Sequence, residues 1–278
     1  MTQRILTLSR YFLRSLLFSL AGLIYILIGF AYWLVMFPPD QHTPEASYYI
    51  LVLAAFGASL TFLATLTIAS RANQAGHAAW IVRLPSRVEY LTAVLLSSIL
   101  FATTLQLLLA LLALFRGPDL SFSQVLFIPP IWLALNTLTA VLALHATDFV
   151  AAGWSRVYLF GLIALFLFGQ SLNDKNSLNT WIILRINDLS RSLAGAGWIV
   201  VVTPLNNLAR WLQQDGPGAL GNFFSLPFWP FHAIANAVIG GSFDTSQALA
   251  PAVLLLYATL LIMLAADIFA NKDLDLTE

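Results

Sequence analysis

The chain has 278 residues, of which 59% are hydrophobic and only 9% are charged, a composition that favours membrane burial over a soluble fold. Thirteen lysines and arginines balance thirteen acidic residues, which argues against a nucleic-acid surface because such a surface needs a basic patch. The absence of cysteine excludes disulfides, thiolate catalysis and cysteine-ligated metals.

Residues 1–15 predict an amphipathic helix. Its apolar face is formed by Ile5, Leu8, Phe12 and Leu16. Its polar face is formed by Gln3, Thr7, Arg10 and Arg14. Cations on the polar face of such a helix are typical of a segment that lies in the membrane surface. The alternative is that this segment extends the first membrane span as one continuous helix.

Six apolar runs are candidates for membrane-spanning helices, since about 20 apolar residues cross a bilayer. They cover residues 16–37, 48–69, 90–115, 125–147, 157–172 and 248–269. The first run is too long for the core of a signal peptide, and the fifth is the shortest of the six. The sequence therefore predicts an all-α polytopic membrane protein, with residues 1–278 forming a single transmembrane domain.

The arginines near the spans indicate the orientation of the chain. The amino end and the loops after the second and fourth runs contain Arg4, Arg10, Arg14, Arg71, Arg83, Arg87 and Arg156. The alternate loops, residues 38–47 and 116–124, contain only Arg116. Because short cytoplasmic loops are enriched in Lys and Arg, the first set is expected inside. Six spans would then return the carboxyl tail to the cytoplasm.

Residues 173–247 are expected to be extracytoplasmic or re-entrant. Two pieces of this region, residues 193–205 and 223–241, are apolar. The second contains Pro227 and Pro230, which favours a re-entrant or interfacial hairpin because broken backbone at membrane depth must be covered by protein. If both pieces crossed the membrane there would be eight spans, and if only one crossed, the tail would be outside.

Few polar side chains interrupt the spans. The amides among them are Gln106, Asn136 and Gln170. They are explained either by interhelical hydrogen bonds or by a weak role in a substrate pathway. Asp148 and Arg156, near the end of the fourth span, are expected to pair. No catalytic or metal-binding set is found, and there is no phosphate-binding loop, so the chain is not expected to be an enzyme.

Residues 70–89 form an unusual segment between the second and third spans. The stretch "NQAGHAAWIV" predicts two to three helical turns. Pro85 disfavours α conformation at Leu84, so a break is expected there. Ser86 is then expected to cap the third membrane helix, with Glu89 as its capping-box partner.

Arg83 and Arg87 flank this break at the depth expected for lipid headgroups, and one explanation is an inside loop anchored to anionic lipid. A second explanation comes from a resemblance. The stretch "AGHAAWIVRLPSRVEYLTAVLL" resembles the first cytoplasmic loop of type-2 ABC exporter permeases, which holds a short coupling helix before the third span. The chain departs from that family at Thr92 and Ala93, where members often have a Gly–Lys pair.

The resemblance implies a permease subunit that forms half of a translocation pathway and has no ATP-binding motif. It implies two copies of a separate ATPase subunit that holds ATP and Mg, a second permease, identical or paralogous, and contacts with membrane lipid. It also implies the cytoplasmic (inner) membrane, with both termini in the cytoplasm. The residues expected to couple to the ATPase are Gln74, Gly76, His77, Trp80, Arg83, Pro85, Arg87 and Glu89. The alternative is a non-transporting membrane anchor or assembly subunit.

Overall fold

The computed structural model describes residues 2–39, 45–118, 120–150, 153–169, 178–214, 216–241 and 244–271. Over these residues the chain is helical, with short 3₁₀ turns and loops and no strand, which confirms the predicted all-α class. The chain divides into two compact units. One contains Met1–Arg156 and Pro230–Glu278, and the other contains Val157–Trp229.

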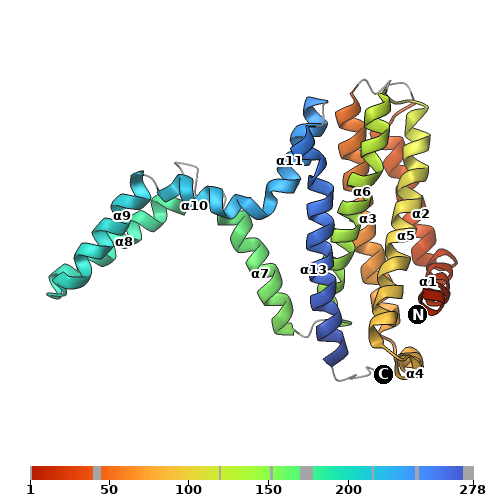
Figure 1. Ribbon diagram of the computed structural model, residues 1–278, viewed down its shortest axis with the longest axis horizontal. Helices are drawn as coiled ribbons and strands as arrows, with labels where there is room; N and C mark the ends of the chain where they lie inside the picture. The colour runs from red at the N-terminus through yellow and green to blue at the C-terminus, as the bar shows by residue number, and fades with distance from the viewer. Residues whose placement is uncertain are drawn as a thin grey trace. The chain divides into compact units, whose positions relative to one another are not determined.

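Four long helices lie side by side in the larger unit (Figure 1). They are α3 (Ala46–Ala72), α5 (Arg87–Leu114), α6 (Phe122–His145) and α13 (Ala250–Asn271). Fully buried alanines lie where these helices pack, among them Ala64, Ala69, Ala102, Ala134 and Ala140. Small side chains allow membrane helices to approach closely, so this pattern suits a bundle that lies in lipid.

The amino-terminal segment is a separate helix. A bend of 70° separates α1 (Thr2–Leu17) from α2 (Leu20–Met36). Ser19 lies in the bend with extended backbone, and its Oγ accepts a hydrogen bond from the Gly22 N–H at 3.2 Å, which caps α2. The segment is therefore not a straight extension of the first span, and the helix covering the predicted span 16–37 begins at Leu20.

Within the described residues, five helices are long and apolar enough to cross a membrane, and the bent pair α1–α2 makes a sixth if it counts as one span. The five are Ala46–Ala72, Arg87–Leu114, Phe122–His145, Gly221–Gly240 and Ala250–Asn271. These helices indicate a membrane protein, as the composition predicts. The set differs from the predicted one, because α7 (Gly153–Gly169) is a shorter apolar helix whereas Gly221–Gly240 is long enough to span.

The smaller unit contains a helical hairpin formed by α8 (Leu178–Gly195) and α9 (Ile199–Gln214). Gly197 has a φ of 80° in the turn, a conformation that glycine adopts without strain. Ser190 Oγ donates to Asn206 Oδ1 at 2.7 Å across the hairpin. The eight-span alternative requires one helix over the apolar piece 193–205, but α8 ends at Gly195 and α9 begins at Ile199. The unit continues through α10 (Gly216–Ser225) and η3 (Leu226–Phe228).

The remaining helices of the larger unit are short. Two of them, α11 (Trp229–Gly240) and α12 (Thr245–Ala248), precede α13. The other two, η1 (Ala75–His77) and α4 (Ala78–Arg83), connect α3 to α5, and Figure 1 shows α4 at the end of the bundle where α5 begins.

Candidate functional site

The connection between α3 and α5 folds as its proline and serine predict. Leu84 has extended backbone (φ −77°, ψ 141°), and its N–H donates to the Trp80 carbonyl at the end of α4. Ser86 Oγ accepts a hydrogen bond from the Val88 N–H at 3.3 Å and so caps α5. The break before Pro85 and the cap at Ser86 are therefore both confirmed, and they separate a short lateral helix from a long membrane helix.

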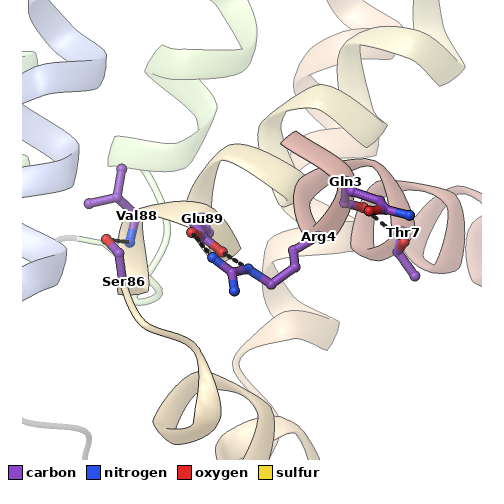
Figure 2. A network of polar contacts seen from close by, with 6 residues as sticks. All are labelled: Gln3, Arg4, Thr7, Ser86, Val88 and Glu89. Atoms are coloured by element: carbon purple, nitrogen blue, oxygen red, sulfur yellow. Dashed lines mark hydrogen bonds and ion pairs between the residues drawn. The ribbon is translucent and has the colours of Figure 1, made fainter. Parts of the chain in front are cut away.

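Glu89 does not complete a capping box. Its carboxylate accepts two hydrogen bonds from Arg4 instead, from Nε at 3.0 Å and from Nη2 at 3.1 Å (Figure 2). The Glu89 side chain is only 4% exposed, whereas that of Arg4 is 51% exposed. Because Glu89 lies in the first turn of α5, the helix dipole also favours its negative charge. The capping-box prediction is wrong because α1 brings a guanidinium to this carboxylate.

Two further hydrogen bonds fasten α1 to the ends of the membrane helices. Ser9 is buried, and its Oγ donates to the carbonyl of Ala93 on α5 at 3.2 Å. Arg71, in the last turn of α3, donates from Nη1 to the carbonyl of Ser15 at 3.0 Å. Together with the Arg4 ion pair, these bonds hold α1 along its length against α3 and α5.

A buried tyrosine joins the two ends of the segment 73–89. Tyr90 is fully buried, and its hydroxyl donates to the Ala72 carbonyl at 3.0 Å. Ala72 is the last residue of α3, where carbonyls have no partner within the helix. The hydrogen bond satisfies one of these carbonyls and fixes the base of the segment.

A chain of aromatic rings connects α4 to the membrane helices. The rings, in order, are Trp80, Tyr11, Phe12, Tyr90, Phe149 and Phe269. Successive ring centroids are 4.8, 5.5, 5.5, 6.0 and 4.6 Å apart. Such pairs add to the stabilisation from burial and resist relative sliding. The last two rings belong to the loop after α6 and to α13, so the chain of rings reaches from α4 across the end of the bundle.

The residues expected to couple to an ATPase separate into an exposed group and a packed group. The exposed residues are Gln74, Gly76, Arg83 and Pro85. The packed residues are His77, Trp80, Arg87 and Glu89. The His77 ring lies 5.0 Å from that of Trp80, and Arg87 Nη1 donates to the Ala270 carbonyl at 3.4 Å. The segment thus has an exposed surface and an anchored one.

The two described amides of the predicted substrate pathway meet inside the bundle. Asn136 Nδ2 donates to Gln106 Oε1 at 2.7 Å, and Gln106 Nε2 donates to the Leu53 carbonyl at 2.8 Å. Both amides are fully buried, and Gly57 lies so close that an added Cβ would be 2.3 Å from the Gln106 side chain. They join α3, α5 and α6, as interhelical hydrogen bonds do. Gln170 lies outside the described residues.

A polar cleft of about 670 Å³ lies at the end of α3 and beside the loop that follows α6. Asp148 and Arg156 form the predicted ion pair at this cleft, and Arg156 Nη1 also donates to the Ala146 carbonyl at 3.4 Å. Gln74 lines the same cleft from the segment before α4. The cleft therefore adjoins the exposed surface of that segment.

Several residues that complete this site were not predicted from the sequence. They are Arg4, Tyr11, Phe149 and Phe269. Glu89 signalled a cationic partner, because a lone acid at the start of an apolar helix requires one once it is buried, but it did not identify Arg4. The ring contacts had no such signal, since, apart from that between the adjacent Tyr11 and Phe12, each joins segments that are distant in the sequence.

A scan against protein-family models found no match, and searches of curated proteins and of solved structures found no matching protein.

Proposed function

We propose that this chain is the membrane subunit of an ATP-driven exporter, a permease that forms half of a translocation pathway and is driven by a separate ATPase. The observation that carries the proposal is the aromatic chain from Trp80 to Phe269, which joins α4 to the ends of α5 and α13. A partner that pushes on α4 would move these helices together. A loosely attached surface loop could not transmit such a movement.

The division of the segment into two surfaces supports the same function. Gln74, Gly76 and Pro85 are exposed and available to a partner, whereas Trp80 packs against α1. Tyr90 holds the base of the segment through Ala72, so a displacement of α4 is not absorbed by opening of the loop. ATP and Mg belong to the partner subunit in this proposal, and two copies of that subunit serve two permease halves.

The proposed topology has six spans, with both termini in the cytoplasm of a cell with an inner membrane. In the bent pair, α2 forms the first span and α1 lies in the membrane surface. In this arrangement α7 crosses outward and the α8–α9 hairpin is extracytoplasmic. If Gly221–Gly240 crossed in place of α7, the tail would still be cytoplasmic but the hairpin would be inside.

The departure at Thr92 and Ala93 has a structural counterpart. Ala93 is fully buried, and its carbonyl accepts the hydrogen bond from Ser9. A lysine side chain at this position would have to displace α1. This arrangement supports a permease in which α1 occupies the space that the lysine of a Gly–Lys pair would need. Either both halves of the permease have this arrangement, or one half of a heteromeric pair has it.

The alternative, a non-transporting anchor or assembly subunit, is favoured by one observation. Gln106 and Asn136 are buried within the chain and bonded to each other, so they offer no polar surface to a passenger. A permease could line its pathway with other groups, at a face completed by the second subunit.

The test is purification of the native complex from cells in which the chain carries an affinity tag. An ATPase subunit is expected in stoichiometric amounts, and Gly76→Glu is expected to remove it without loss of membrane insertion. Position 76 suits this test because an added Cβ there meets no atom within 4 Å. The matched control is Ser192→Glu, at an exposed position on the hairpin. If no ATPase accompanies the unmodified chain, the anchor function replaces the permease.

A further inference from the structure

A groove of about 450 Å³ lies between α1 and the end of α4. Its principal lining residues are Gln3, Arg4, Thr7, Leu8, Trp80 and Arg83. The groove shares Trp80 with the aromatic contacts and Arg4 with the ion pair to Glu89, but neither of those contacts fills it. Its lining combines cationic, hydroxyl and apolar groups, a mixture that suits a ligand with a charged head and an apolar body.

Arg83 supplies an unneutralised charge to this groove. Its side chain is exposed and makes no hydrogen bond or ion pair within the part of the chain that the structure describes. Arg4 differs, because Nε and Nη2 are held by Glu89, which neutralises its charge and fixes its orientation. Nη1 of Arg4 is not used in that ion pair. The groove therefore carries the positive charge of Arg83, and Glu89 holds the guanidinium of Arg4 in a fixed orientation beside it.

The surroundings of the groove are those of a membrane surface. The helix α1 bends by 70° away from α2, and its apolar side chains are not all covered by the bundle, since Leu6 remains 55% exposed. Its exposed Arg10 and Arg14 lie on the polar face, as in helices that rest among lipid headgroups. Trp80 is a residue type that is enriched at this depth. The groove thus opens where phospholipid headgroups are found.

We propose that this groove binds the phosphodiester headgroup of an anionic phospholipid. Arg83 donates to the phosphate oxygens in the two-pronged geometry that guanidinium and phosphate share. Nη1 of Arg4 offers a second donor, and Leu8 and Trp80 form the apolar wall. Basic pockets at the cytoplasmic ends of membrane helices are suited to such headgroups. The assignment holds whether or not an ATPase docks on α4, so it stands apart from the proposed function.

The test is lipid titration of the full chain, purified in detergent and stripped of lipid, with bound lipids counted by native mass spectrometry. The probes are phosphatidylglycerol and phosphatidylcholine. One phosphatidylglycerol is expected to bind more tightly than phosphatidylcholine, and Arg83→Gln is expected to weaken its binding about tenfold or more, the loss of a charged hydrogen bond. Arg83→Lys should bind more tightly than Arg83→Gln but less tightly than the unmodified chain, because lysine keeps the positive charge but lacks the two-pronged donor geometry of the guanidinium.

The matched control is Arg10→Gln, which removes one arginine charge from the exposed polar face of α1, outside the groove. It should change affinity less than Arg83→Gln does, since a charge outside the groove contributes at most about 1 kcal/mol, or about fivefold, and donates no hydrogen bond to the phosphate. An equal loss of affinity in both variants would show that the lipid is attracted to the charged surface in general and is not bound by this groove. If Arg83→Gln misfolds, Gln3→Glu tests the same groove by adding a negative charge at the start of α1, where the helix dipole favours it.

Two other outcomes overturn the assignment. Glycerophosphoglycerol, which is the phosphodiester headgroup without acyl chains, should not displace the lipid, and displacement at equal concentration would indicate a site for soluble phosphate. An acidic protein that copurifies with the unmodified chain and is lost in Arg83→Gln, with lipid binding unchanged, would indicate a protein-binding groove.

Discussion

Arg4 and Glu89 are 85 positions apart in the sequence, yet they form a two-pronged ion pair that joins the first turn of α1 to the first turn of α5 (Figure 2). The pair is asymmetric, because the carboxylate is buried and the guanidinium is half exposed. Both hydrogen bonds that the structure gives the buried Glu89 carboxylate come from Arg4. The ion pair therefore makes the position of α1 depend on the start of α5.

Replacing Arg4 with alanine is expected to lower the free energy of unfolding by about 1–3 kcal/mol, because the buried Glu89 carboxylate loses both of its hydrogen bonds. The double variant Arg4→Ala/Glu89→Gln should recover part of this loss, since a neutral amide is less costly to bury unpaired. Thermal unfolding in detergent measures both effects. Identical stability of the single and double variants would show that the carboxylate is not the source of the cost.

Tyr90→Phe tests the base of the segment between α3 and α5. The ring contacts remain, so only the hydrogen bond to Ala72 is lost, at about 0.5–1.5 kcal/mol of stability. Tyr90→Ala also interrupts the aromatic chain and should cost about 3–5 kcal/mol, and under the proposed function it should abolish substrate-stimulated ATP hydrolysis by the partner subunit. The control is Tyr257→Phe, whose hydroxyl makes no hydrogen bond among the described residues and whose removal should be nearly neutral. Coupled hydrolysis in a folded Tyr90→Ala variant would contradict the proposed transmission through the rings.

Two glycines should respond oppositely to a methyl group. Gly57→Ala is expected to destabilise the bundle by about 1–3 kcal/mol, because the added Cβ would be 2.3 Å from the Gln106 side chain. Gly76→Ala should be tolerated, since no atom lies within 4 Å of its added Cβ. Adding Gln106→Ala to Gly57→Ala should relieve the steric overlap. A thermal denaturation series on these variants checks all three expectations, and equal effects at the two glycines would exclude close packing of Gln106 on α3.

The helices could be predicted from the sequence where a single physical rule decides. The apolar run 48–69 falls within α3, and the run 90–115 matches α5 except for its last residue, because a membrane imposes a minimum length on its helices. The local effects of Pro85 on Leu84 and of Ser86 on α5 also follow from their chemistry alone. These rules involve neighbours in the chain and need no knowledge of the fold.

The contacts at the site could not be predicted, because they depend on the bend between α1 and α2. No residue near Ser19 encodes an angle of 70°, and without that angle Arg4 has no reason to meet Glu89. Pro227 and Pro230 favoured a re-entrant or interfacial hairpin over residues 223–241, and the structure has a short 3₁₀ turn, η3, between α10 and α11 in this region. Pro227 lies at the start of η3 and Pro230 in the first turn of α11, where a missing N–H costs little.

The membrane topology can be tested directly, because the natural chain has no cysteine and accepts single reporters. Ser192→Cys places a thiol on the exposed side of the α8–α9 hairpin, and Gly76→Cys places one before α4. In intact cells a membrane-impermeant maleimide is expected to label Ser192→Cys only, and both variants should react after the membrane is opened. The reason is that, in the proposed topology, α7 carries the chain outward before the hairpin begins. Protection of Ser192→Cys in intact cells would show that Gly221–Gly240 crosses the membrane instead, and labelling of Gly76→Cys would contradict the cytoplasmic position of the segment on which the proposed coupling depends.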